Sequence, residues 1–385
     1  MIVRLDKFVS GGQTIGTLES GKKCFLWGGL PGERVEFRAT KQKSRLIEGV
    51  VERVLEASPL RVEPRDAQYL ATSPWQILDF GAEMTAKKEL IIEAFRQEHL
   101  ELPDFEMVTD GSEYYYRNKM EYSLYWDKAA EKIELAFRER GSHRKVPIIQ
   151  SSIERLEILV SAQEIVADLN ARGEEARKYQ SLMLRCNQAG EVAGGLLENG
   201  RPHPVFPSLE DEILGRKYSY SPNGFFQINL PMYELALQEI ADWVEGEEVL
   251  DLYAGVGTIG LSVAGKRKLT LVELHKLAVE EMQANAKDME AEVVLAKSED
   301  ALSHIAGKDT VIVDPPRAGL HREVVEGLLA QKTPRVIYLS CNPTTQARDV
   351  KNLVAGGYKV DFVKGFNFFP KTPHIENLII LSLKG

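Results

Sequence analysis

The sequence of 385 residues has few cysteines and no long apolar run. Its three cysteines, Cys24, Cys186 and Cys341, are too few and too scattered for a disulfide framework or a Cys-x-x-Cys zinc site. No segment approaches the ~20 apolar residues that a membrane span needs. Asp6 and Lys7 interrupt the N-terminus before a signal-peptide core could form. These absences predict a cytoplasmic protein with no membrane association, no bound metal and no obligate protein partner, in which any special cysteine acts alone.

Positive charge is also scarce. Lys and Arg number 48 against 57 Asp and Glu, a net charge of −9, which argues against holding nucleic acid by bulk attraction. Residues 1–60 are the exception, because they carry more basic than acidic side chains, with Lys41, Lys43 and Arg45 close together. This cluster indicates either a local RNA contact or a solvated loop.

The length and the changes of pattern predict three domains. Residues 1–62 have short strands separated by Gly and Pro turns, typical of a small β-barrel of the kind that binds single strands. Residues 63–230 mix strands and helices, which predicts an α+β middle domain; one helix, expected over 85–99 with Thr85 as its N-cap, could pack on the next domain.

The last part of the chain, 231–385, alternates apolar strands with helices. Strands that are apolar on both faces belong in a buried parallel sheet, so this part is predicted to be a doubly wound, Rossmann-like α/β domain. The expected strands are 249–253, 269–274, 293–296, 310–314, 336–340 and 378–383.

A glycine-rich turn follows the first of these strands. Segment 255–260 has the G-x-G-x-x-G spacing, and Glu273 ends the next strand, where a carboxylate can accept hydrogen bonds from ribose hydroxyls. Asp251 and Asp314, at two strand ends, favour S-adenosylmethionine over a dinucleotide, since carboxylates attract a sulfonium and repel a pyrophosphate. An NAD-dependent dehydrogenase, or glycines that serve packing alone, remain alternatives.

Cys341 follows the predicted strand 336–340 and precedes a helix that should start near Pro343. Open α/β sheets bind ligands beyond such strand ends, and a helix N-terminus lowers the pKa of a thiol. The position predicts a nucleophile, with a buried structural cysteine as the alternative. Glu376, before the last strand, is either a base or a solvated charge.

Several motifs together resemble those of the RNA 5-methyluridine methyltransferases, which act on tRNA and 23S ribosomal RNA. The four C-terminal ones are Phe225-Phe-Gln227-Ile-Asn229, DPPR at 314–317, Cys341 within SCNP, and HIE at 374–376. The LPGERV segment at 30–35 is similar to the small, OB-type TRAM barrel of that family. Tyr116-Arg-Asn-Lys119 and Gly141-Ser-His143 are similar to its middle domain.

The resemblance implies roles for single residues. Cys341 would be the nucleophile, and Glu376 the base that takes the C5 proton. The residues implied around S-adenosylmethionine are Gln227, Tyr253, Thr258, Glu273 and Asp314. Several relatives have asparagine in the place of Thr258.

The sequence departs from many relatives in one respect. They hold an iron–sulfur cluster on four cysteines, three of them in the stretch that corresponds to 66–75 and the last near Ser151. This chain has no cysteine at any of these positions, so the ligand count excludes a cluster.

We therefore expect a methyltransferase that modifies C5 of a specific uridine in RNA, with 23S ribosomal RNA ranked ahead of tRNA as the substrate. An RNA cytosine-5 methyltransferase is the nearest alternative, although that class has a second cysteine where this chain has DPPR. A dehydrogenase would bind NAD instead. A non-catalytic RNA-binding or scaffolding protein would tolerate the loss of Cys341.

Overall fold

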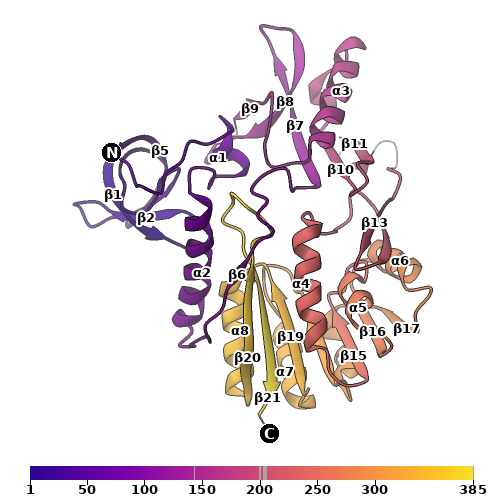
Figure 1. Ribbon diagram of the computed structural model, residues 1–385. Coiled ribbons are helices and arrows are strands. Elements are labelled where there is room, and N and C mark those ends of the chain that lie inside the picture. Colours follow the sequence, from indigo (N-terminus) through magenta and orange to yellow (C-terminus); the bar gives the residue numbers. More distant parts are fainter. Residues whose placement is uncertain (143, 199–200, 203–205, 385) are drawn as a thin grey trace.

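Three parts follow one another along the chain: a small barrel, a middle sheet with one long helix, and a C-terminal sheet flanked by helices (Figure 1). In the computed structural model, the described residues are 1–142, 144–198, 201–202 and 206–384. His143, from one of the middle-domain motifs, lies outside them. None of the described helices is long and apolar enough to cross a membrane.

The first sixty residues form the predicted β-barrel. Side chains alternate between interior and surface, so Val, Leu, Ile and Phe side chains fill the interior. The strands close in the order β1-β2-β3-β5-β4. They are β1 (Ile2–Phe8), β2 (Thr14–Thr17), β3 (Lys23–Trp27), β4 (Arg34–Gln42) and β5 (Leu46–Glu56).

The basic cluster of the barrel lies on its surface at the β4–β5 turn. Lys41 pairs with Glu48 at 3.9 Å, whereas Lys43 and Arg45 extend into solvent. Exposed ion pairs contribute little to stability. The cluster is therefore available to a partner, and it is not needed to hold the barrel together.

The middle of the chain forms a six-stranded sheet in the order β12-β11-β10-β7-β8-β9, with α3 packed on it. Its strands are β7 (Lys119–Asp127), β8 (Lys132–Arg138), β9 (Lys145–Pro147), β10 (Ser181–Cys186), β11 (Val192–Glu198) and β12 (Arg201–Pro202). The other elements of this region are α1 (Tyr69–Thr72), α3 (Leu156–Ala171), a 3₁₀ turn at Ala176–Lys178 and the hairpin β13 (Leu209–Ile213) and β14 (Arg216–Tyr220).

The C-terminal sheet has eight strands in the order β17-β16-β15-β18-β19-β21-β20-β6. They are β15 (Glu248–Leu252), β16 (Lys268–Glu273), β17 (Ala291–Leu295), β18 (Thr310–Val313), β19 (Arg335–Ser340), β20 (Tyr358–Phe366), β21 (Glu376–Leu383) and the short β6 (Met107–Val108). One face packs against α4 (Leu230–Trp243), α5 (Thr258–Val263) and α6 (Lys276–Asn285). The other packs against α7 (Arg322–Gln331) and α8 (Pro343–Ala355), and 3₁₀ turns lie at Ser298–Asp300 and Leu302–Ile305.

The sheet is mixed, not wholly parallel as predicted. β15 to β19 are parallel, but β21 runs antiparallel to both β19 and β20. The predicted strands are all continuous apolar runs, so they leave out β20, in which apolar and polar residues alternate as in a half-buried strand. The reversal brings the start of β21, Glu376, beside the end of β19.

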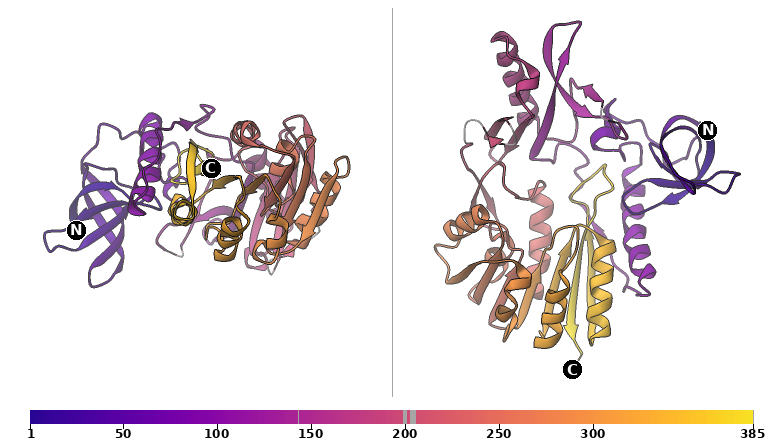
Figure 2. Two further views of the ribbon diagram at one scale, coloured as in Figure 1. Left: turned by 90° about the horizontal axis from the view of Figure 1, so that it is seen from below. Right: turned by 180° about the vertical axis from the view of Figure 1, so that it is seen from behind.

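Helix α2 (Phe80–Gln97) precedes the middle sheet in sequence but packs on the C-terminal sheet, against α8. Figures 1 and 2 show the barrel beside α2 at one side of the molecule, with α5 and α6 on the opposite side. The helix begins earlier than the predicted N-cap Thr85. The side chain of Asp79 accepts a hydrogen bond from the amide of Ala82 and caps the helix, while Thr85 bonds to the Gly81 carbonyl within it.

Candidate active site

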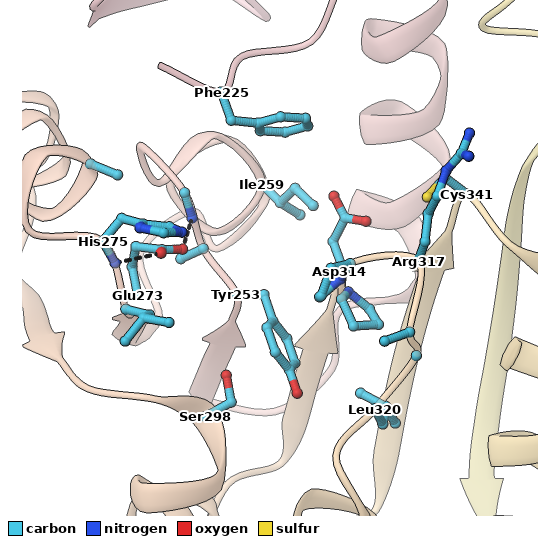
Figure 3. A pocket seen from close by; sticks show the side chains of 18 of the residues that line it. Phe225, Tyr253, Ile259, Glu273, His275, Ser298, Asp314, Arg317, Leu320 and Cys341 are labelled. Atoms are coloured by element: carbon cyan, nitrogen blue, oxygen red, sulfur yellow. Dashed lines mark hydrogen bonds between the residues drawn. The ribbon is translucent and has the colours of Figure 1, made fainter. Parts of the chain in front are cut away.

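A cavity of about 1950 Å³ opens at the carboxyl ends of the parallel strands. Successive strand ends supply its lining because every parallel strand points its C-terminus to the same edge of the sheet. Figure 3 shows Glu273 and Cys341 on opposite sides of the cavity, with Asp314 between them. The seven residues to which the resemblance gives a role in the reaction or the cofactor site all line it: Gln227, Tyr253, Thr258, Glu273, Asp314, Cys341 and Glu376.

The glycine turn forms one wall. Gly257 has φ 87° and sits at the N-terminus of α5, in a conformation that side chains rarely adopt. Glu273 accepts hydrogen bonds from the amides of Gly255 at 2.9 Å and His275 at 2.8 Å, so one carboxylate braces two turns (Figure 3). Each oxygen keeps a second lone pair for a ligand hydroxyl.

Asp251 does not face the cavity, so the prediction that it meets a sulfonium is wrong. Its side chain is fully buried beneath the turn and accepts a hydrogen bond from the amide of Gly260 at 2.8 Å. A Cβ at Gly260 would lie 2.9 Å from that carboxylate, so the third glycine serves close packing. Burial raises the pKa of Asp251 to about 8. Neighbouring strand residues point to opposite faces, and here Asp251 points toward α5.

Two further carboxyl groups line the cavity: Glu376 is buried and Asp314 is half-buried. Burial raises the pKa of Asp314 to about 7. Burial and the nearby negative charge of Asp314 raise the pKa of Glu376 well above its ordinary value, and Arg317 opposes this shift. A cationic ligand would favour the ionised forms of both carboxyl groups. A carboxyl group with a raised pKa is suited to proton transfer near neutral pH.

Cys341 follows β19, and α8 begins at Pro343 as predicted, with Asn342 as its N-cap. The expected lowering of the thiol pKa is wrong. Burial, followed by the charges of Glu376 and Asp314, raises the pKa of Cys341 to about 12, and the opposing charge of Arg317 does not offset them.

Sequence reasoning missed the pairing of Arg317 with His374. The guanidinium lies 2.7 Å from Nδ1 of His374 and also interacts with the thiol of Cys341. Burial and the positive charge of Arg317 lower the pKa of His374 to about 4, so the ring is neutral and Nδ1 accepts the hydrogen bond. The last residue of DPPR and the first of HIE were the available signals, but only the fold brings them together.

The segment that holds Gln227 is fixed from two sides. Asn118 donates to the Gln227 carbonyl at 3.1 Å, and the side chain of Asn229 donates to the Phe368 carbonyl at 3.0 Å. Both contacts are buried. Phe225, in the same segment, is 74% exposed at the rim of the cavity (Figure 3).

The start of β21 is also held firmly. Asn377 is fully buried and donates to Oε1 of Gln346 on α8 at 2.7 Å, and Gln346 donates to the Tyr338 carbonyl at 3.0 Å. These bonds fix the backbone next to Glu376. Among the described residues, no group of three or more His, Cys, Asp and Glu side chains is arranged to hold a metal ion.

Comparison with known protein families matches the two parts that build this cavity. Residues 301–384 match the tRNA (Uracil-5-)-methyltransferase family. Residues 234–335 match the methyltransferase small domain family. The first match contains Asp314, Cys341 and Glu376, and the second contains the glycine turn and Glu273.

Known relatives match over nearly the whole chain. An uncharacterized RNA methyltransferase of Synechocystis is 30% identical over 434 residues, covering 96% of this chain and 93% of the relative. The 23S rRNA (uracil(1939)-C(5))-methyltransferase RlmD of Pseudomonas entomophila is 26% identical, covering 98% and 92%. The crystal structure of the Pyrococcus abyssi tRNA (uracil-54, C5)-methyltransferase with S-adenosyl-L-homocysteine matches in fold, with a TM-score of 0.78, 24% identity and coverage of 99% and 100%.

Proposed function

Because this chain belongs to the family of S-adenosylmethionine-dependent RNA uracil-C5 methyltransferases, we propose that Cys341 and Glu376 methylate one specific uridine, in 23S ribosomal RNA ahead of tRNA. Membership of this family excludes the alternative of an NAD-dependent dehydrogenase. The observation that carries the proposal is the single cavity that contains both residues together with Asp314 and the glycine turn. The RlmD relative, which is named as a 23S rRNA methyltransferase, supports that choice of substrate.

The lining of the cavity fits S-adenosylmethionine. Leu274 and Leu277 are 51% and 48% exposed within it and offer an apolar surface for the adenine. Glu273 would accept hydrogen bonds from ribose hydroxyls, and Asp314 would face the cationic part. Gln227, Tyr253 and Thr258 complete the proposed cofactor set. When bound, the cofactor supplies an electrophilic methyl group.

Cys341 would make C5 of the uracil nucleophilic. The C5 carbon of uracil attacks electrophiles poorly while the 5,6 double bond is intact. Addition of the thiolate sulfur to C6 forms an S–C6 bond and moves the electron pair of the double bond toward C5 and the C4 carbonyl. C5 then accepts the methyl group and still carries its hydrogen.

Glu376 would complete the reaction as the base. The carboxylate removes the C5 proton, the 5,6 double bond re-forms, and the S–C6 bond breaks to release the thiolate. Its buried position beside Asp314 gives it a raised pKa, so it retains proton affinity near neutral pH. The hydrogen bonds of Asn377 keep this part of the backbone in place.

We also propose that the enzyme works without an iron–sulfur cluster. The segment around Asp66 is joined to residue Ser152 by hydrogen bonds of 2.7 and 2.9 Å, and Gln76 donates to Asp66 at 2.8 Å. These contacts are buried and link the two stretches that correspond to the cluster-binding positions of relatives. They give the region a fold stabilised by polar side chains.

The direct test is mass spectrometry of ribosomal and transfer RNA from a strain that lacks the gene. We expect one 5-methyluridine to be missing from 23S rRNA and restored by the wild-type gene but not by Cys341→Ala. A missing 5-methyluridine in tRNA alone would move the substrate to tRNA. Unchanged 5-methyluridine in both, or a missing 5-methylcytidine, would contradict the proposed function.

A further inference from the structure

The lining of the cavity includes three cations in or next to strands of the middle sheet, Arg117, Lys119 and Arg185, here called the cation cluster. Lys119 begins β7, Arg117 precedes it by two residues, and Arg185 lies near the end of β10. Lys119 and Arg185 are directly opposed across the antiparallel β7–β10 pair. Like charges in opposed positions destabilise a sheet, so this arrangement costs stability unless a ligand compensates for it.

Arg185 has donors that the protein does not use. It is 1% exposed, one nitrogen donates to the Phe226 carbonyl at 2.8 Å, and the guanidinium lies 5.3 Å from the ring centre of Tyr220. Within the part of the chain that the structure describes, its Nε and its other terminal nitrogen have no hydrogen-bond partner. A buried guanidinium with unused donors is costly, and an acceptor from outside would satisfy it.

The hydrogen bonds of the other two cations go to backbone carbonyls. Lys119 donates to Gly224 at 3.0 Å and to Asn223 at 3.4 Å, and Nε of Arg117 donates to the Lys119 carbonyl at 2.8 Å. Burial and the charge of Arg185 lower the pKa of Lys119 to about 8. A bound anion would stabilise all three charges.

The two carboxylates that attract Arg185 are engaged elsewhere. Asp211 accepts hydrogen bonds from the Tyr220 hydroxyl and the Gln188 amide. Glu281 accepts them from the amide and hydroxyl of Ser221. Both act on Arg185 only through longer-range attraction.

We propose that the cation cluster binds backbone phosphates of the RNA next to the target uridine, an inference that rests on the proposed function. The cluster shares its cavity with Cys341 and Glu376. S-adenosylmethionine brings a sulfonium and an ammonium group, which suit the carboxyl groups of Glu273 and Asp314 in the same cavity. RNA brings a negative charge with every nucleotide, and contacts to phosphates fix the register of the chain without reading its bases.

The test compares Lys119→Gln with Lys287→Gln, which changes an exposed lysine outside the cavity lining. The probe is a fluorescent oligouridylate, and its dissociation constant is measured over a series of salt concentrations. Loss of one charged contact should weaken binding roughly tenfold. It should also reduce the slope of log K against log salt by about 0.7, the value for single strands. Lys287→Gln should retain the wild-type slope and affinity.

A second probe needs no variant, so it remains decisive if Lys119→Gln does not fold. In this oligouridylate, the phosphates on both sides of the central uridine are replaced by neutral methylphosphonates. The wild-type protein should bind it at least tenfold more weakly than the charged probe. Equal binding of the two probes, no measurable binding of either, or an unchanged slope in Lys119→Gln would overturn the phosphate site.

Two further readouts separate the remaining outcomes. Calorimetry with S-adenosylhomocysteine should give the same affinity for wild type and Lys119→Gln. Weaker cofactor binding with unchanged RNA binding would assign the cluster to the cofactor carboxylate and overturn the proposal. Failure of the proposed function would appear differently, as wild-type protein that binds the charged probe but forms no 5-methyluridine in RNA from the deletion strain.

Discussion

At the scale of single residues, the thiol of Cys341 lies among groups that oppose its ionisation. Burial and the two carboxyl groups of Glu376 and Asp314 raise its pKa to about 12, and only Arg317 acts in the opposite direction. At this pKa, the thiol is protonated at neutral pH. Ligands that neutralise the carboxyl groups would raise the thiolate fraction, which couples reactivity to assembly of the complete site.

The proposed roles of Cys341 and Glu376 predict different products from two inactive variants. Cys341→Ala removes the nucleophile, so neither covalent adduct nor methylated RNA should form. Glu376→Gln keeps the nucleophile but cannot take the C5 proton, so a methylated RNA–protein adduct should accumulate. The measurement is denaturing electrophoresis with a labelled methyl donor. Labelled adduct with Cys341→Ala, or near-normal turnover with Glu376→Gln, would refute these roles.

The raised thiol pKa predicts slow alkylation of Cys341. Its rate with iodoacetamide should keep rising up to about pH 10, since the thiolate fraction grows with pH as long as the pKa of about 12 lies above it. Arg317→Gln removes a favourable charge and should slow the reaction several-fold at about pH 9. Arg177→Gln, at an 85% exposed side chain, should leave the rate unchanged. Peptide mass spectrometry distinguishes Cys341 from the buried Cys24 and Cys186; equal rates in wild type and Arg317→Gln would contradict the influence of Arg317.

At the scale of elements, α2 anchors the loop that leads to Glu376. The fully buried pair Lys87–Glu83 spans 2.9 Å within the helix. Lys87 also donates to Oδ1 of Asn367 at 2.6 Å, and Glu83 accepts from the Lys371 amide at 3.0 Å. The loop 367–375 therefore depends on a helix that is almost 300 positions earlier in the chain.

The contacts of α2 predict that replacing Lys87 lowers the free energy of unfolding strongly, whereas replacing Lys88 lowers it little. Lys87→Met leaves Glu83 buried without its partner, so the free energy of unfolding should fall by about 3–5 kcal/mol. Lys88→Met removes a pair with Asp104, whose side chain is 95% exposed, and should change it by less than about 1 kcal/mol. Urea denaturation measures both, and the double variant Glu83→Gln/Lys87→Met should recover part of the loss. Equal effects at both lysines would contradict the anchor.

At the scale of the whole molecule, two parts of the chain supply the charges that line the cavity. The C-terminal part contributes the carboxyl groups of Glu273, Asp314 and Glu376 together with Arg317, and the middle part contributes the cation cluster. The barrel reaches the same region, because Trp75 donates to the Gly12 carbonyl at 3.0 Å and its backbone bonds to Lys371 in the loop before Glu376. A cationic cofactor and an anionic RNA would thus each meet groups of opposite charge in this lining.

The carboxyl groups that line the cavity predict which nucleotide cofactor binds. Calorimetry should detect S-adenosylhomocysteine and S-adenosylmethionine but no NAD, whose pyrophosphate would be repelled by Asp314. Asp314→Asn should weaken S-adenosylmethionine more than S-adenosylhomocysteine, because only the former carries the sulfonium charge. Tighter binding of NAD, or equal losses for the two ligands, would contradict this arrangement.

The sequence by itself determined the features that depend on short windows. Alternating side chains and turn residues predict the barrel, the glycine spacing predicts the turn before α5, and α8 begins at Pro343 as expected. Four motifs in order indicated the family and its chemistry. These signals are readable because strand period, turn conformation and helix caps involve neighbouring residues. The domain boundaries at 62 and 230 and the individual residue roles stay predictions.

Only the tertiary structure decided what depends on residues far apart in the chain. The side chain of Asp251 accepts a hydrogen bond from Gly260 in the glycine turn and does not face the cavity. The pKa of Cys341 is raised, although its place before a helix predicted a lowered value. The register of β7 and β10 likewise places Lys119 directly opposite Arg185. Charge–charge energies and desolvation are set by distances and burial in the folded chain, which no local pattern of residues contains.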